Sequence, residues 1–267
     1  LTLRGGGTLG NTNAFVLNNA NSKLLLNSIT LGSASTSLAS LGLDVNANST
    51  VTSLSVGHIT PVSIDTGKTL SGAITVTAGS IKLGEAGTLA STVSMSGGTL
   101  DADNNITVSG ALSHTADINI DVASGKTLTY SGTAIGVGAN TITLSGGGTF
   151  TSGGMTLDNA NSKLVLASIT LDGASTSADN LGLDVDANST VTDFEVGHTT
   201  PVSIAQGVTL SGGVDVSAGS IKLNETGTLA STLTMAGGTL DMDETATVSG
   251  TLTHSADITI DVAAGKS

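Results

Sequence analysis

The stretch NSKLLLNSITL, residues 21–31, occurs again almost unchanged as NSKLVLASITL, residues 161–171. The two stretches belong to a longer repeat, because residues 17–127 align without a gap with residues 157–267, and 76 of the 111 aligned positions are identical. Internal repeats of this kind are typical of proteins that grow by adding copies of one structural unit. The first question about this chain is therefore what one unit looks like.

The repeat divides the chain into two modules. The first module covers residues 1–141 and is incomplete at its start, and the second covers residues 142–267 and is truncated. We expect both modules to form one continuous solenoid. We also expect the array to continue beyond the chain, because both ends fall inside a module and no capping segment is visible.

A finer pattern recurs about every 20 residues within each module. It consists of an apolar residue, a turn rich in Gly, Asn, Asp or Ser, and then Thr, Ser or Lys before the next apolar residue. The pattern occurs seven times in one module, at residues 64–70, 83–89, 100–108, 120–128, 144–150, 157–164 and 183–191. The apolar residues at the two ends of such a segment mark two pieces of the coil. A third piece, in which apolar and polar residues alternate, follows most of these segments, at residues 74–76, 93–95, 112–114, 135–137, 169–171 and 194–196. The segment that starts at Leu144 lacks such a piece.

Strict alternation of apolar and polar residues predicts short β-strands, and no stretch has the 3.6-residue period of a helix. Gly, Asn, Asp and Ser favour the turns between them. The sequence thus predicts an all-β fold, a parallel β-solenoid with about seven coils per module, stacked at about 4.8 Å. A chain of immunoglobulin-like sandwiches is the alternative all-β fold, but the short period and very short strands favour the solenoid.

Alternation also predicts which side chains point inward. The expected core residues of the first module, each with an equivalent 140 positions later, are Ile64, Leu70, Ile74, Val76, Leu83, Leu89, Val93 and Met95. Asp and Glu increase from 7 in residues 17–127 to 14 in residues 157–267. Among the new acids, Glu195 and Asp215 stand at positions that alternation places outside.

The composition excludes several classes of function. The chain has a net charge of −13, one Arg, 1% aromatic residues and no Cys. Nucleic-acid binding is not expected, because it needs clustered Lys and Arg. No run of 18 apolar residues occurs, so no membrane span is expected in this segment.

The rhythm and composition of the whole chain, best seen in TLSGAITVTAGSIKL at residues 69–83, resemble the β-solenoid repeats of large bacterial surface and secreted proteins. These include autotransporter passengers and filamentous-haemagglutinin-like adhesins. The resemblance implies an extracellular or cell-surface location in a bacterium. It carries over architecture and location but no functional residue, because no motif diagnostic of one family is present.

The four histidines form two repeated pairs, His58 with His198 and His114 with His254. His114 occupies a slot that holds an apolar residue in other coils, which favours a buried or corner histidine over a metal ligand. Ser, His and Asp could form a triad by chance, but the G-x-S-x-G elbow is absent. We therefore expect no catalytic residue and no enzyme activity.

The only cofactor candidate is Ca²⁺. Two groups of side chains have the oxygen spacing with which a calcium loop begins. One group is Asp184, Asp186 and Asn188, and the other is Asp101 and Asp103. Neither group has the Gly and the distant Glu of an EF-hand, and turns at solenoid corners would also explain these residues.

The function expected from these observations is structural. The chain would be a segment of an extracellular rod, filament or adhesin stalk, with further copies or further modules of the same chain as partners, end to end. One alternative is an adhesin whose solenoid surface binds a ligand, which an exposed apolar or aromatic groove would favour. Another is a carbohydrate-active β-helix enzyme, which carboxylates lining a cleft would favour.

Overall fold

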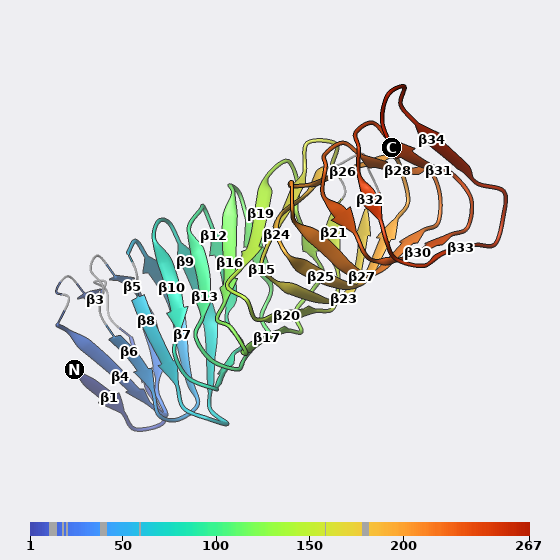
Figure 1. Ribbon diagram of the computed structural model, residues 1–267. Coiled ribbons are helices and arrows are strands. Elements are labelled where there is room, and N and C mark those ends of the chain that lie inside the picture. The colour runs from blue at the N-terminus through green and yellow to red at the C-terminus, as the bar shows by residue number, and fades with distance from the viewer. Residues whose placement is uncertain are drawn as a thin grey trace. The chain divides into compact units, whose positions relative to one another are not determined.

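The computed structural model describes residues 1–267 except residues 11–14, 18, 20, 38–41, 59, 158 and 178–181. The chain divides into two compact units, Leu1–Thr133 and Ala134–Ser267. Each unit is a stack of short strands, and the described residues contain no helix (Figure 1). The strand pairs are parallel, with about 20 residues per turn, which confirms the predicted β-solenoid.

One sheet in each unit takes one strand from every coil. In the first unit these strands are, in spatial order, β1 (Thr2–Arg4), β4 (Lys23–Asn27), β6 (Gly42–Val45), β8 (Thr60–Ile64), β10 (Ser80–Leu83), β13 (Thr99–Ala102) and β16 (Ile118–Val122). In the second unit they are β19 (Thr141–Ser145), β22 (Lys163–Ala167), β24 (Gly182–Ala187), β26 (Thr200–Ile204), β28 (Ser220–Leu223), β31 (Thr239–Met242) and β34 (Thr259–Val262).

The rest of each coil forms a second, bent sheet. In the first unit it contains β2 (Thr8–Leu9), β3 (Phe15–Leu17), β5 (Thr30–Ser37), β7 (Ser49–Val56), β9 (Thr69–Val76), β11 (Thr88–Leu89), β12 (Thr92–Met95), β14 (Ile106–Val108), β15 (Leu112–His114) and β17 (Thr127–Tyr130). In the second unit it contains β18 (Ile135–Gly136), β20 (Thr149–Ser152), β21 (Met155–Leu157), β23 (Thr170–Ser177), β25 (Ser189–Val196), β27 (Thr209–Val216), β29 (Thr228–Leu229), β30 (Thr232–Met235), β32 (Thr247–Val248) and β33 (Leu252–His254). In the coil of β10, the bend separates β11 from β12, whereas β9 in the preceding coil runs through it as one strand.

The core consists of columns of apolar side chains that stack in register. Leu43 pairs with Val62, and Val62 pairs with Leu83 in the next coil. All three are buried. The eight predicted core residues and their eight equivalents 140 positions later are each at most 3% exposed, so this prediction is confirmed. The predicted outward placement of the new acids is also confirmed, since Glu195 and Asp215 lie opposite each other on neighbouring strands and neither is buried.

Glycine makes the bend of the second sheet possible. The register between β7 and β9 shifts after Val51, and Gly72 lies beside it with a φ of 112°. A Cβ atom at Gly72 would lie 1.7 Å from the carbonyl oxygen of Val51 in the preceding coil. Gly212 repeats this arrangement against Val191, again at 1.7 Å. No other residue fits at these two positions without moving the backbone.

Two predicted strand assignments in one region were wrong. The coil of Leu144 does have a third piece, namely β21 at Met155–Leu157, and residues 169–171 lie at the start of the second sheet instead. The cause is a very tight corner between β22 and β23. Ser168 turns this corner with a φ of 64°, and Ser28 turns the equivalent corner with a φ of 55°. The residue type serine does not reveal this conformation in the sequence. The strands beside this corner were therefore assigned to the wrong parts of the coil.

Candidate functional site

The four histidines differ in exposure, since His58, His198 and His254 are exposed and only His114 is partly buried. His114 stands opposite Met95 on the neighbouring strand, in the inward slot, and is half-buried. Its Nδ1 is 3.0 Å from the carbonyl oxygen of Ala116, and His254 makes the same contact with Ala256 at 3.1 Å. Among the residues that the structure describes, no three His, Asp or Glu side chains are grouped so that they could hold a metal ion.

The calcium candidates contact protein groups. Lys163 pairs with Asp184, and Lys82 bridges both acids of the other group, at 3.0 Å from Asp101 and 2.6 Å from Asp103. Asp186 is exposed. Asn188 lies at a corner, where its side-chain oxygen accepts the N–H of Thr209 in the next coil at 2.9 Å. Weak calcium binding therefore stays a prediction, and any bound ion would compete with lysine at Asp184, Asp101 and Asp103.

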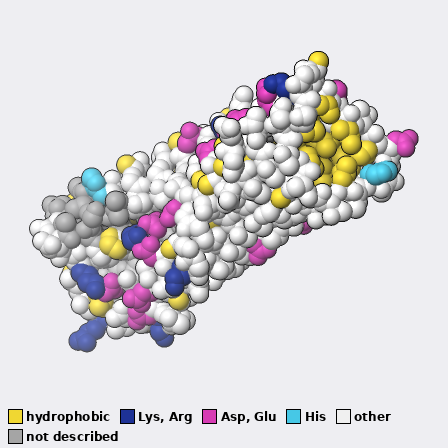
Figure 2. All heavy atoms as spheres, in the orientation of Figure 1, with side chains coloured by type: hydrophobic (Ala, Val, Ile, Leu, Met, Phe, Trp, Pro, Cys, Tyr) yellow, Lys and Arg dark blue, Asp and Glu magenta, His cyan; other side chains and the backbone are white. Residues whose placement is uncertain are grey.

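These lysines form a repeated set of ion pairs on the outside of the first sheet. Lys222 repeats the bridge of Lys82, at 3.2 Å from Asp241 and 2.6 Å from Asp243. The hydrogen bonds that Lys82 donates to Asp103 and, to a smaller extent, to Asp101 raise the pKa of Lys82 above its ordinary value of 10.5. Figure 2 shows Lys and acidic side chains interspersed on one face of the first unit.

We expect the stabilisation that the ion pairs of Lys82 give the fold to be lost at strongly alkaline pH. Because the folded-state pKa is raised, the contribution is fully present below about pH 10.5 and is lost as the pH rises through the higher folded value. It should be at most about 1 kcal/mol, since the lysine is partly exposed. Urea unfolding of Lys82→Gln and wild-type protein at pH 8 and pH 11.5 measures this.

The matched control for this prediction is Lys68→Gln, because Lys68 has no ion pair with a described residue. Lys82→Gln should lower stability more than Lys68→Gln at pH 8, and the two variants should converge at pH 11.5. An equal loss for Lys82→Gln at both pH values would contradict the expectation.

The second unit carries an acidic groove. Residues 134–267 contain 14 acidic and 3 basic residues, against 7 and 5 in residues 1–133. This groove is a surface cavity of about 320 Å³, and three of its lining side chains are acidic. It is lined by Asp193, Glu195, Asp215, Val216, Ser217, Thr234 and Ala236. Ser217 Oγ donates to Glu195 Oε1 at 2.7 Å. The groove supplies carboxylates for acid–base chemistry, but neither an aromatic platform nor a basic side chain is among its lining residues.

The single tyrosine satisfies two backbone groups that the strand ladders leave open. The side chain of Tyr130 is buried, and its hydroxyl donates to the carbonyl oxygen of Thr133 at 2.7 Å. The same oxygen accepts the N–H of Leu112 at 3.0 Å. This hydroxyl therefore takes the place of a backbone partner next to β15.

Removing this hydroxyl should have a measurable cost. We expect Tyr130→Phe to lower the free energy of unfolding by about 1–3 kcal/mol, because the buried N–H of Leu112 would lose its acceptor. Urea unfolding followed by circular dichroism measures the change. Thr129→Val removes a hydroxyl from the neighbouring outward-facing position and should cost less; equal losses in the two variants would argue against the tyrosine bridge.

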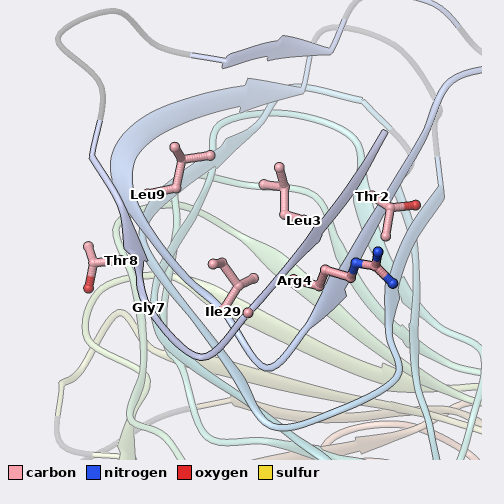
Figure 3. Close-up of a pocket in the computed structure, with 8 residues that line it drawn as sticks. Thr2, Leu3, Arg4, Gly7, Thr8, Leu9 and Ile29 are labelled. Carbon is pink, nitrogen blue, oxygen red and sulfur yellow. The ribbon is translucent and has the colours of Figure 1, made fainter.

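The end of the first unit that carries β1 is open. A cavity of about 360 Å³ lies there, and it is lined by Thr2, Leu3, Arg4, Gly5, Gly7, Thr8, Leu9 and Ile29. Figure 3 shows Leu3, Leu9 and Ile29 facing the space enclosed by the first coils. In the second unit, Leu144 and Phe150 pair with β22 and β23 as Leu3 and Leu9 pair with β4 and β5, and both are buried. The core columns of the first unit are therefore accessible at this end.

The end of the second unit that carries β34 is open as well. Ile260 is 53% and Val262 43% exposed, whereas their equivalents Ile120 and Val122 are fully buried. Figure 2 shows a concentrated hydrophobic area over this end, next to a histidine. Sequence reasoning did not single out these side chains as exposed. Comparing each residue with its partner 140 positions away is the signal that finds them.

No helix among the described residues has the length and apolar character of a membrane span. No family model, curated protein or solved structure matches the chain.

Proposed function

We propose that the chain is a non-enzymatic structural segment of an extracellular bacterial rod, filament or adhesin stalk. In this proposal further coils of the same kind, from further copies or from further modules of the same chain, stack end to end. The observation that carries it is the parallel ladder in which each coil pairs in register with the next, as Leu43 does with Val62 and Val62 with Leu83.

Two physical arguments support the ends as the working surfaces. An uncovered parallel strand offers a full row of N–H and C=O groups to another strand, which makes it a template for pairing. The net charge of −13 keeps the sides of such rods apart, because like-charged surfaces repel each other. Hydrophobic ends with acidic sides favour growth along the axis over lateral clumping.

Sedimentation and electron microscopy of the purified chain test the proposal. We expect concentration-dependent assembly into particles of constant width and increasing length. The variant Ile260→Lys should shift the protein toward the monomer, because a charge at this end would be buried on stacking. Thr259→Lys is the matched control, since Thr259 lies on the same strand but faces the opposite side.

Two results would contradict the proposal. One is a chain that stays monomeric at all concentrations, or that assembles equally well with Ile260→Lys. The other is enzyme activity: turnover of a polysaccharide in a substrate panel that is lost in Glu195→Gln or Asp215→Asn would show that the acidic groove is a catalytic site.

A further inference from the structure

Three corners of the solenoid carry the same acceptor pattern. Asn-x-Ser/Thr is the sequence to which N-linked sugars are attached in secreted proteins. It occurs at residues 48–50 and, at the equivalent place in the second copy, at residues 188–190, which both read Asn-Ser-Thr. Residues 105–107, which read Asn-Ile-Thr, are a third case. In all three, the asparagine lies immediately before a strand of the second sheet, namely β7, β25 or β14.

The side-chain oxygens of Asn48, Asn105 and Asn188 are engaged, whereas their side-chain nitrogens are not. All three residues are exposed. Each Oδ1 atom accepts the backbone N–H of the first residue of a strand in the next coil, β9, β17 or β27, at 3.0 Å for Asn48 and 2.9 Å for the other two. Their Nδ2 atoms make no hydrogen bond with a residue that the structure describes. The planar amide group therefore has its oxygen fixed at the corner and presents its nitrogen to solvent.

The other two residues of each pattern are oriented as an extended acceptor requires. The middle residue points into the core, since Ser49, Ile106 and Ser189 are at most 5% exposed. The threonine that follows it is only half-buried and stands on the outer face, because side chains alternate along an extended strand. The asparagine amide and the threonine hydroxyl are thus on the same side of the chain, where one enzyme can contact both.

A small polar hollow adjoins the acceptor in both copies, beside the corner that Ser28 or Ser168 turns with a positive φ. Its volume is about 120 Å³ in each unit. The lining residues are Gly6, Ser28, Ile29, Thr30, Asn48, Ser49 and Thr50 in the first unit, and Gly147, Ser168, Ile169, Thr170, Asn188, Ser189 and Thr190 in the second. Because several of these side chains are hydroxyls, the hollow suits a hydroxyl substituent of a first sugar better than an apolar group.

We propose that Asn48, Asn105 and Asn188 are sites of N-linked glycosylation on the flank of the solenoid, with a nucleoside diphosphate sugar as the donor. The Nδ2 atom forms a bond to the anomeric carbon of the sugar, the bond from that carbon to the diphosphate breaks, and one Nδ2 proton passes to a base of the transferase. The Oδ1 atom keeps its lone pairs, so the corner hydrogen bond persists in the modified chain. The inference goes beyond the proposed structural role and does not depend on the stacking of further coils.

Incubation of the folded, intact chain with a soluble Asn-x-Ser/Thr transferase and uridine diphosphate glucose tests the proposal. Peptide mapping by mass spectrometry should place a sugar on each of the three asparagines. Thr190→Val should abolish the sugar at Asn188, because it removes the hydroxyl of the pattern, and Thr190→Ser should retain it. Asn46→Gln is the matched control, since Asn46 is exposed at the same corner as Asn48 but lies outside the pattern. This variant should leave the sugar at Asn48 unchanged.

Three results would each overturn the inference. The first is a folded chain that takes no sugar at Asn48 and Asn188, although synthetic peptides of residues 44–54 and 184–194 accept it from the same enzyme. The second is a sugar at Asn188 that survives Thr190→Val. The third is unmodified asparagine at all three positions in the chain isolated from the cells that produce it. Circular dichroism ensures that the variants compared are folded, and sedimentation tests the rod separately, so either proposal can fail without the other.

Discussion

Phe194→Ala should lower the free energy of unfolding by about 3–5 kcal/mol. Phe194 is 1% exposed and lies in register with Val214 of the next coil. The stacked strands above and below are tied by backbone hydrogen bonds, so the coil cannot collapse into the space that the ring leaves. Urea unfolding followed by circular dichroism measures the loss as a change in the midpoint.

The chain provides its own control for this prediction. Leu54 occupies the equivalent position of the first copy and is 3% exposed, which shows that the coil accommodates a leucine there. Phe194→Leu should therefore cost much less than Phe194→Ala. Similar losses for the two variants would mean that the aromatic ring itself, and not the filled volume, stabilises this coil.

Gly212→Ala should cost about 2–5 kcal/mol, through backbone strain together with overpacking. Gly212 has a φ of 106°, and a methyl group there would meet the carbonyl oxygen of Val191 at 1.7 Å. The coil can admit this methyl group only by separating from the preceding coil, which breaks the bend of the second sheet. The same unfolding measurement detects the loss.

Gly207→Ala separates strain from contact. Gly207 also has a positive φ, of 77°, but nothing lies within 4 Å of the position that its Cβ would take. It should lose only the strain, about 1 kcal/mol. If both variants lose the same amount, close stacking at the bend does not limit the fold.

The repeat made most of the fold predictable. Stacked coils place the same residue type at the equivalent position many times. The alternation of apolar and polar residues therefore correctly predicted that Ile64, Leu70 and Met95 are buried. Prediction failed where the backbone departs from this regularity. Ser28 and Ser168 turn tight corners with a positive φ. Serine rarely adopts this conformation, so the sequence did not reveal the corners, and the coil boundaries beside them were misplaced.

The candidate sites were less predictable, because they depend on what lies next to a residue in space. Sequence alternation placed Glu195 and Asp215 outside, but it could not show that they and Asp193 line one cavity. The exposure of Ile260 and the double role of the Tyr130 hydroxyl likewise arise from neighbouring coils. Both become visible only when each coil is compared with its equivalent in the other copy.

The parallel ladders described above have a mechanical consequence. The backbone hydrogen bonds of the parallel ladders join one coil to the next, so a force that pulls an end strand away loads these bonds a few at a time and does not shear a whole sheet at once. The solenoid should peel coil by coil at low force. Each coil of about 20 residues releases about 65–70 Å of contour length. A stalk built in this way would act as an extensible tether that takes up load by lengthening and winds up again when the load is removed.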